Sequence, residues 1–251
     1  MVEAHGPAPP RNFCQSFAFF PASAGFYTVG VTSSLFEPAR QALHGHLFSR
    51  SIDESSIRYR YEHCLRVGAI GRKVALAEGL DADLLELACL LHDIGKFDAT
   101  VAVDHGRAGA RIAKSILDGL GLGEAEQREV LQGIAMHTDG KWNYDQDSPD
   151  HPGFDLFTAQ PSVLSRSVGD CDNVDRYSLL RIHGTMNWVK FSEKTTPEAL
   201  SWIDEYLAHL DRERTYVCAT ETAQELWMSA LDDHEQYFTR LAQQLKSGLT
   251  A

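Results

Sequence analysis

The sequence predicts an all-α fold. From residue 51 onward, apolar residues recur at steps of three and four, as Val67, Ile70 and Val74 do, which is the period of a helix buried on one face. No stretch of useful length alternates polar and apolar residues as a half-buried strand would. The chain has 251 residues, 43% hydrophobic and 23% charged, and is long enough to bury a core. We therefore expect a helical domain with extensions.

The chain divides into two predicted regions. Residues 1–50 form an N-terminal extension rich in Gly, Pro and Ser, in which only 37–48 are expected to be helical, with His44 and His46 at the surface. Residues 51–251 form the helical domain, with a core over 57–182 and C-terminal helices over 183–251. An irregular, aromatic-containing connection is expected over 141–161, either as a pocket wall or as a surface loop.

Residues typical of helix ends mark the helices of this domain. Asp81 and Asp104 are predicted N-caps, and Gly79, Gly95 and Gly121 stand where helices are expected to stop. The predicted helices cover 57–78, the stretch from Asp81 to Gly95, 104–120, 124–138, 162–182, 196–210 and 220–245.

The composition limits the classes of partner that we expect for this protein and the compartment in which it works. The formal net charge is −12, and no cluster of Lys and Arg offers a stripe for nucleic-acid phosphates, so we expect no extended nucleic-acid partner. The five cysteines form no Cys-x-x-Cys pair, which fits a reducing compartment. No segment reaches the ~18 apolar residues of a membrane span, and we expect a cytoplasmic protein with no membrane partner. A homo-oligomer is compatible with the sequence.

Histidines and aspartates on separate predicted helices suggest a metal site. His63 lies in the first helix of the core, His92 and Asp93 end the second, His105 opens the third and His137 ends the fourth. A single His on an apolar face is more often a hydrogen-bonded core residue than a ligand. Several converging on one point would instead be stabilised by a shared cation, which replaces their hydration. A later helix adds Asp170, Asp172 and Asp175.

These residues resemble the HD-domain superfamily of metal-dependent phosphohydrolases, whose pattern is a His, a His-Asp doublet after Leu-Leu, and a distant Asp. The string Leu-Leu-His-Asp-Ile-Gly-Lys-Phe at 90–97 is the most specific match, and the resemblance covers about residues 57–182. It implies a helical HD fold and metal ligation by His63, His92, Asp93 and a terminal Asp. His105 and His137 resemble the positions where some members add ligands for a second ion.

Two aspartates compete for the terminal ligand. The alignment with the family's Asp-x-Leu-Asp form assigns it to Asp172, which also lies at the edge of the apolar stripe of its helix, whereas Asp170 lies about 200° away at 100° per residue. We choose Asp172, and keep Asp170 as an alternate ligand or as a group that orients a histidine.

The resemblance implies a phosphohydrolase acting on a nucleotide or another small phosphorylated metabolite. The cofactor would be one or two divalent ions (Mn, Fe, Co, Ni, Mg or Zn), and Asp93 would be catalytic, near a metal-activated water. Lys96 would either bind the phosphate or simply complement the end of its helix. The alternatives are a di-iron oxygenase of the same fold, acting on a small organic substrate, and a non-catalytic HD sensor module.

Overall fold

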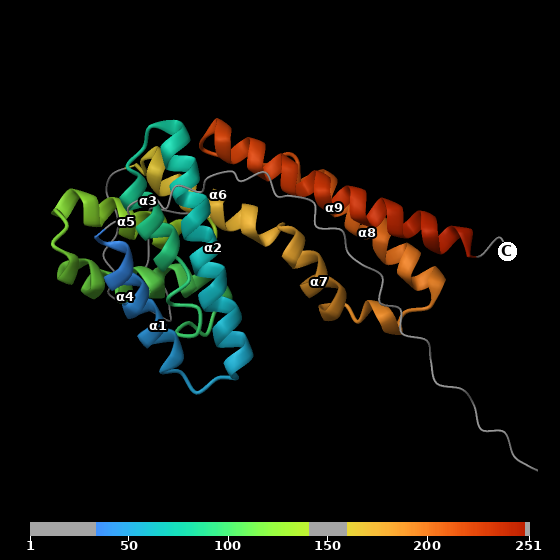
Figure 1. The fold of residues 1–251 in the computed structure, drawn as a ribbon, viewed down its shortest axis with the longest axis horizontal. Helices are drawn as coiled ribbons and strands as arrows, with labels where there is room; N and C mark the ends of the chain where they lie inside the picture. The colour runs from blue at the N-terminus through green and yellow to red at the C-terminus, as the bar shows by residue number, and fades with distance from the viewer. Residues whose placement is uncertain (1–33, 141–159, 249–251) are drawn as a thin grey trace, which may run out of the picture. The chain divides into compact units, whose positions relative to one another are not determined.

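The computed structural model describes residues 34–140 and 160–248, and this part of the chain is helical (Figure 1). It contains no strand, so the all-α prediction is confirmed for the residues described. The helices are α1 (Phe36–Phe48), α2 (Glu54–Glu78), α3 (Ala82–Leu91), α4 (His105–Leu120), α5 (Glu124–Met136), α6 (Val163–Arg176), α7 (Leu179–Trp188), α8 (Thr196–Glu213) and α9 (Glu221–Ser247), with short 3-10 turns at Ala102–Asp104 and Phe191–Glu193. Most of the predicted connection over 141–161 lies outside the described residues.

One apolar core joins helices α1 to α6. Val67 of α2, Leu90 of α3, Ile134 of α5 and Val168 of α6 are fully buried in it. The helix predicted within the N-terminal extension, α1, contributes three fully buried residues to the same core, Ala39, Leu43 and Leu47. Its packing therefore makes α1 part of this helical body.

Polar contacts also attach α1 to the segment that follows the His-Asp pair. Asp98 lies 2.9 Å from the Nε2 atom of His46 and forms an ion pair with Arg50. His46 is thus half-buried and paired rather than a free surface residue, whereas His44 is exposed and stacks on Phe48.

Local chemistry explains most helix ends. The Asp81 side chain accepts hydrogen bonds from the backbone N–H groups of Asp83 and Leu84, so its predicted capping role is confirmed. Gly79 ends α2 with a φ of 68°, a conformation that favours glycine. Asp104 occupies the predicted N-cap position of α4, but its carboxylate caps nothing and instead accepts from Arg107.

The predicted helix over 162–182 is helical for most of its length, but the chain breaks at Tyr177 and Ser178, between α6 and α7. The backbone N–H of Tyr177 bonds back to Asn173, and that of Ser178 bonds back to Asp175 in a tight turn. The carbonyl of Ser178 accepts from the backbone N–H of Arg181 and also from Nε2 of His234 on α9, 3.2 Å away. A buried histidine of α9 thus forms a hydrogen bond with the backbone at the break.

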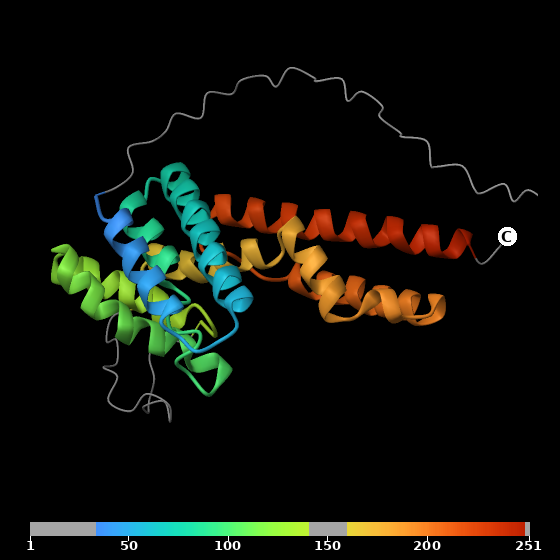
Figure 2. The same ribbon diagram turned by 60° about the horizontal axis from the view of Figure 1, so that its bottom comes forward.

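Helices α7 to α9 pack through two smaller apolar clusters. Trp227 and Leu231 of α9 meet Leu210 of α8 in one, and Phe238 of α9 meets Ile203 of α8 in the other. Figure 2 shows α8 and α9 running alongside each other. In the described ranges, no helix combines the length and apolar character required to cross a bilayer.

Candidate metal centre

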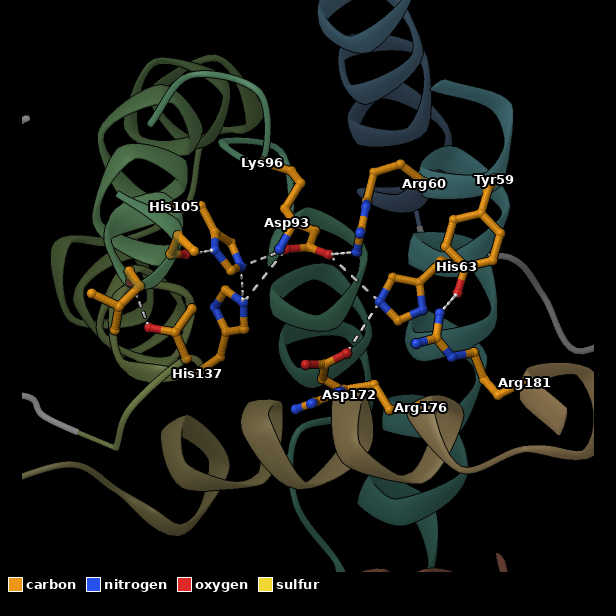
Figure 3. Close-up of a pocket in the computed structure, with 13 residues that line it drawn as sticks. Tyr59, Arg60, His63, Asp93, Lys96, His105, His137, Asp172, Arg176 and Arg181 are labelled. Carbon is orange, nitrogen blue, oxygen red and sulfur yellow. Dashed lines mark hydrogen bonds and ion pairs between the residues drawn. The ribbon is translucent and has the colours of Figure 1, made fainter. Parts of the chain in front are cut away.

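Five segments bring the predicted site residues together in one pocket (Figure 3). His63 lies within α2, Asp172 lies within α6, and His105 is the first residue of α4. His92 and His137 are the first residues beyond the ends of α3 and α5. Asp93 comes directly after His92 and lies between two groups of these side chains, which form the two halves of the site.

The first half is formed around one oxygen of Asp93. Nε2 of His63 lies 3.1 Å from Oδ1 of Asp172 and 3.2 Å from Nε2 of His92. Oδ2 of Asp93 lies 3.6 Å from Nε2 of His63 and 3.5 Å from Nε2 of His92. Ligand atoms this close to one another could share a single cation.

The second half is formed around the other oxygen of Asp93. Oδ1 lies 2.8 Å from Nε2 of His105 and 3.6 Å from Nε2 of His137, and the two imidazole nitrogens are 3.1 Å apart. Among the described residues, this buried Oδ1 atom has no hydrogen bond of acceptable geometry. Asp93 therefore presents one oxygen to each half of the site.

Three of the four histidines direct Nε2 towards the centre of the site, because their Nδ1 atoms bond to backbone carbonyls. Nδ1 of His92 bonds to the carbonyl of Cys89 at 2.7 Å, and Nδ1 of His137 bonds to the carbonyl of Ile134 at 2.7 Å. Nδ1 of His105 bonds to the carbonyl of Ala102. A carbonyl can only accept, so each Nδ1 must carry the proton and, in the neutral ring, Nε2 carries the lone pair. Converging lone pairs repel unless a cation lies between them, so the donor set fits a divalent metal ion.

The pKa shifts of the site residues also favour a bound cation. Burial disfavours a proton on His92, but Asp93 and Asp172 outweigh it and raise the pKa of His92 to about 10. Burial likewise opposes ionisation of Asp93, yet His92 and His105 hold its pKa well below the usual range. For His137, burial together with the neighbouring imidazoles lowers the pKa. The site thus holds positive charge at its centre, as a proton when no metal is bound.

Asp175 orients His63, a role that the sequence did not assign to it. Its carboxylate accepts from Nδ1 of His63 at 2.7 Å and from Nε and Nη2 of Arg66 at 2.8 and 3.0 Å. The prediction that Asp170 might orient a histidine is wrong, because Asp170 accepts from Tyr216 Oη and from the backbone N–H of Ala219. The position of Asp175 within the apolar stripe of α6 was the available indication, since a buried carboxylate needs partners.

Glycines let the site segments approach closely. A Cβ at Gly95 would lie 2.3 Å from the backbone nitrogen of Gly109, and one at Gly106 would lie 2.8 Å from the carbonyl oxygen of Ala135. The first contact seats the His-Asp segment on α4, and the second brings α4 against α5 beside His137. Gly95 is therefore needed for close packing rather than as a helix stop, since α3 already ends at Leu91.

Cationic side chains line the same pocket, which has a volume of about 410 Å³. Arg60 forms an ion pair with Asp93. Lys96 lines the pocket, and burial lowers its pKa. Arg176 and Arg181 complete the set. A pocket with this lining can hold a cation among its His and Asp side chains and an anion beside its Arg and Lys side chains.

Comparison with known proteins agrees with this geometry. The family model for the HD domain matches residues 60–177, which include both members of the doublet and the other proposed ligands. This chain contains an HD domain. A crystal structure of a predicted HD superfamily hydrolase from an uncultured Thermotogales bacterium is similar to it, with 18% sequence identity and a TM-score of 0.54. That likeness covers 85% of this chain and 92% of the other, so the shared fold extends beyond the residues of the family match.

Proposed function

We propose that the HD domain makes this protein a metal-dependent phosphohydrolase that cleaves a phosphoester of a nucleotide or another small phosphorylated metabolite. One observation carries the proposal: metal-type donors converge at Asp93, in a pocket that four cationic side chains also line. The similarity in fold to a predicted HD superfamily hydrolase supports the class of reaction. A divalent ion bound among these donors would lower the pKa of a water molecule and polarise a phosphoryl oxygen.

The side chains would divide the remaining work. His63, His92, Asp93 and Asp172 would hold one ion, and His105, His137 and Oδ1 of Asp93 would hold a second. Asp93 would position both. Arg60, which pairs with Asp93 and lines the same pocket, would donate to a phosphoryl oxygen. Lys96, which makes no ion pair within the described residues, would contribute a point charge to the same group.

A metal-content measurement followed by a phosphoester panel tests this proposal. The full chain, purified without added metal, is assayed for bound metals and then for phosphate release with Mg, Mn, Fe, Co, Ni or Zn. Asp93→Ala should abolish both metal retention and turnover. Asp204→Ala, on an exposed part of α8, is the matched control and should retain both. Full activity in metal-free protein would refute the proposal.

A di-iron oxygenase is the second candidate, because the six proposed ligands comprise four His and two Asp in two halves joined by Asp93. Such an enzyme would hold two irons per chain and consume oxygen with an organic substrate. The cationic lining of the pocket favours phosphate chemistry. Oxygen uptake by the iron-loaded chain with an organophosphonate or a polyol, without phosphate release from any ester, would favour the oxygenase.

A further inference from the structure

We propose that the substrate carries a second anionic group, and that Arg181 binds this group with Tyr59 at the outer side of the metal pocket. This inference rests on the proposed phosphohydrolase function and specifies its substrate class. It makes Arg181 a determinant of specificity, separate from the residues that would hold the metal and the phosphoryl group undergoing hydrolysis.

The two residues lie on the far side of His63 from the second half of the metal site. The ring of Tyr59 is parallel to that of His63, with an interplanar angle of 1° and centroids 6.3 Å apart. Arg181 donates to the Tyr59 hydroxyl, and its guanidinium carbon lies 5.8 Å from the centre of the Tyr59 ring. Figure 3 shows both beyond His63, whereas His105 and His137 lie on the opposite side of Asp93. A group bound at Arg181 is thus displaced from the second half of the site.

The positive charge of the pocket exceeds the negative charge of one phosphate group. Arg60, Lys96, Arg176 and Arg181 contribute four positive charges, and only Asp93 and Asp172 supply carboxylates to the lining. Each divalent ion would add two further positive charges. A phosphomonoester carries at most two negative charges, so even one ion leaves an excess that a second anionic group would neutralise.

Three of these cations have no carboxylate partner in the described part of the chain. Lys96 and Arg181 take part in no ion pair there, and the side chain of Arg176 bonds only to the amide oxygen of Asn173, at 3.2 Å. The hydrogen bond from Arg181 to the Tyr59 hydroxyl uses one donor of the guanidinium and leaves the others free. A half-buried guanidinium without a carboxylate is suited to binding a carboxylate or phosphate in a bidentate way.

The break between α6 and α7 fixes the position of Arg181. Its backbone N–H bonds to the carbonyl of Ser178 at 2.8 Å, and that carbonyl also accepts from His234. Nδ1 of His234 in turn lies 2.8 Å from the hydroxyl of Tyr206. Tyr59 lies on α2, the helix that carries His63, whereas Arg181 lies on α7, beyond the residues that match the HD family model, so the contact joins the family core to a helix that follows it.

The pocket has room for a second group. Its volume of about 410 Å³ lies in the usual range for small-molecule sites. Tyr59 and Arg60 also line a neighbouring hollow of about 290 Å³, together with Ser55, Ser56 and Phe97. A substrate whose phosphate lies at Asp93 can therefore extend past Tyr59.

Three non-hydrolysable probes of matched length test the inference: propylphosphonate, 3-phosphonopropionate and propane-1,3-bisphosphonate. Calorimetry on the full chain in Mn²⁺ measures their dissociation constants without any turnover. We expect at least one of the two doubly anionic probes to bind about tenfold more tightly than propylphosphonate, the effect of one added charge-assisted contact. The bisphosphonate binding more tightly would identify a second phosphate, and the phosphonopropionate a carboxylate.

Arg181→Gln should remove this preference while leaving the affinity for propylphosphonate unchanged. Tyr59→Phe, which keeps the ring but loses the hydroxyl that holds Arg181, should reduce the preference in part. Arg58→Gln is the control, since Arg58 is exposed on the same helix as Tyr59 and does not line the pocket. An equal loss for all three probes in Arg181→Gln, no preference in the unaltered chain, or no binding of any probe would each overturn the inference. A retained preference without any phosphoester hydrolysis would refute the proposed function and leave the second anion site standing.

Discussion

Asp175→Asn should weaken metal binding as well as the fold. The wild-type carboxylate is 2% exposed and accepts from His63 and twice from Arg66. Burial opposes its ionisation, but these partners lower its pKa below the usual value, so the side chain is held as an anion. The amide keeps the shape and loses the charge that polarises His63 towards the metal.

The magnitude follows from the hydrogen bonds that an amide at this position cannot accept. Changing a group that orients a metal-binding histidine typically costs ~10–100-fold in metal affinity, or about 1.4–2.7 kcal/mol. The metal-free fold should lose about 1–3 kcal/mol, because an amide cannot satisfy all the donors that face Asp175. Chelator competition measures the first quantity, and urea unfolding in excess chelator measures the second.

Asp170→Asn is the matched control on the same helix. Asp170 is 1% exposed and accepts from Tyr216 at 2.6 Å and from Ala219 at 2.7 Å, away from the metal donors. Its substitution should also destabilise the fold by about 1–3 kcal/mol and leave metal affinity unchanged. Equal metal affinities for Asp175→Asn and the unaltered chain, or an equal loss in both variants, would refute the assigned role of Asp175.

The remaining predictions concern the metal centre and the helices that carry it. If two ions bind, His105→Ala should lower the metal content from two ions per chain to one, because the ligands of the first ion remain. Elemental analysis measures this content. Loss of both ions would contradict the assignment of one ion to each oxygen of Asp93. Gly106→Ala should lower both the melting temperature and the metal content, because its Cβ would lie 2.8 Å from a backbone oxygen. Gly119→Ala is the control: its Cβ would face open space, and the substitution should stabilise the helix by up to ~1 kcal/mol. The raised pKa of His92, about 10 against a usual 6.5, means that metal must displace a proton at neutral pH, so affinity should rise about tenfold per pH unit from 7 to 9. In the metal-free chain the same shift contributes stability that is fully present below pH 6.5 and is lost as pH rises towards 10, so the melting temperature should fall over that range.

The helices were largely predictable because their determinants are local. The apolar period of α2, the Asp81 cap and the Gly79 stop are all visible within a few residues of sequence. The break after Arg176 was not, because it depends on His234, which lies 56 residues beyond Ser178 in the chain. The non-capping carboxylate of Asp104 is a similar case, since Arg107 and the fold compete for it.

The site followed a comparable division. The sequence indicated which residues could bind metal, because His92 and Asp93 stand in a specific string and His63, His105, His137 and Asp172 lie on other helices. Their distances, and the placement of each Asp93 oxygen, came from packing at Gly95 and Gly106. Whether these residues bind metal is a prediction for the assays above.

What the sequence alone determined was the fold class and the chemical types at the site, since helical periodicity and donor identity are properties of single residues and their near neighbours. Only the tertiary structure decided which aspartate orients His63, that Arg60 reaches Asp93, and that Arg181 meets Tyr59. Each of these contacts joins residues at least 33 positions apart, and the direction of a side chain on a helix depends on how that helix packs against the others.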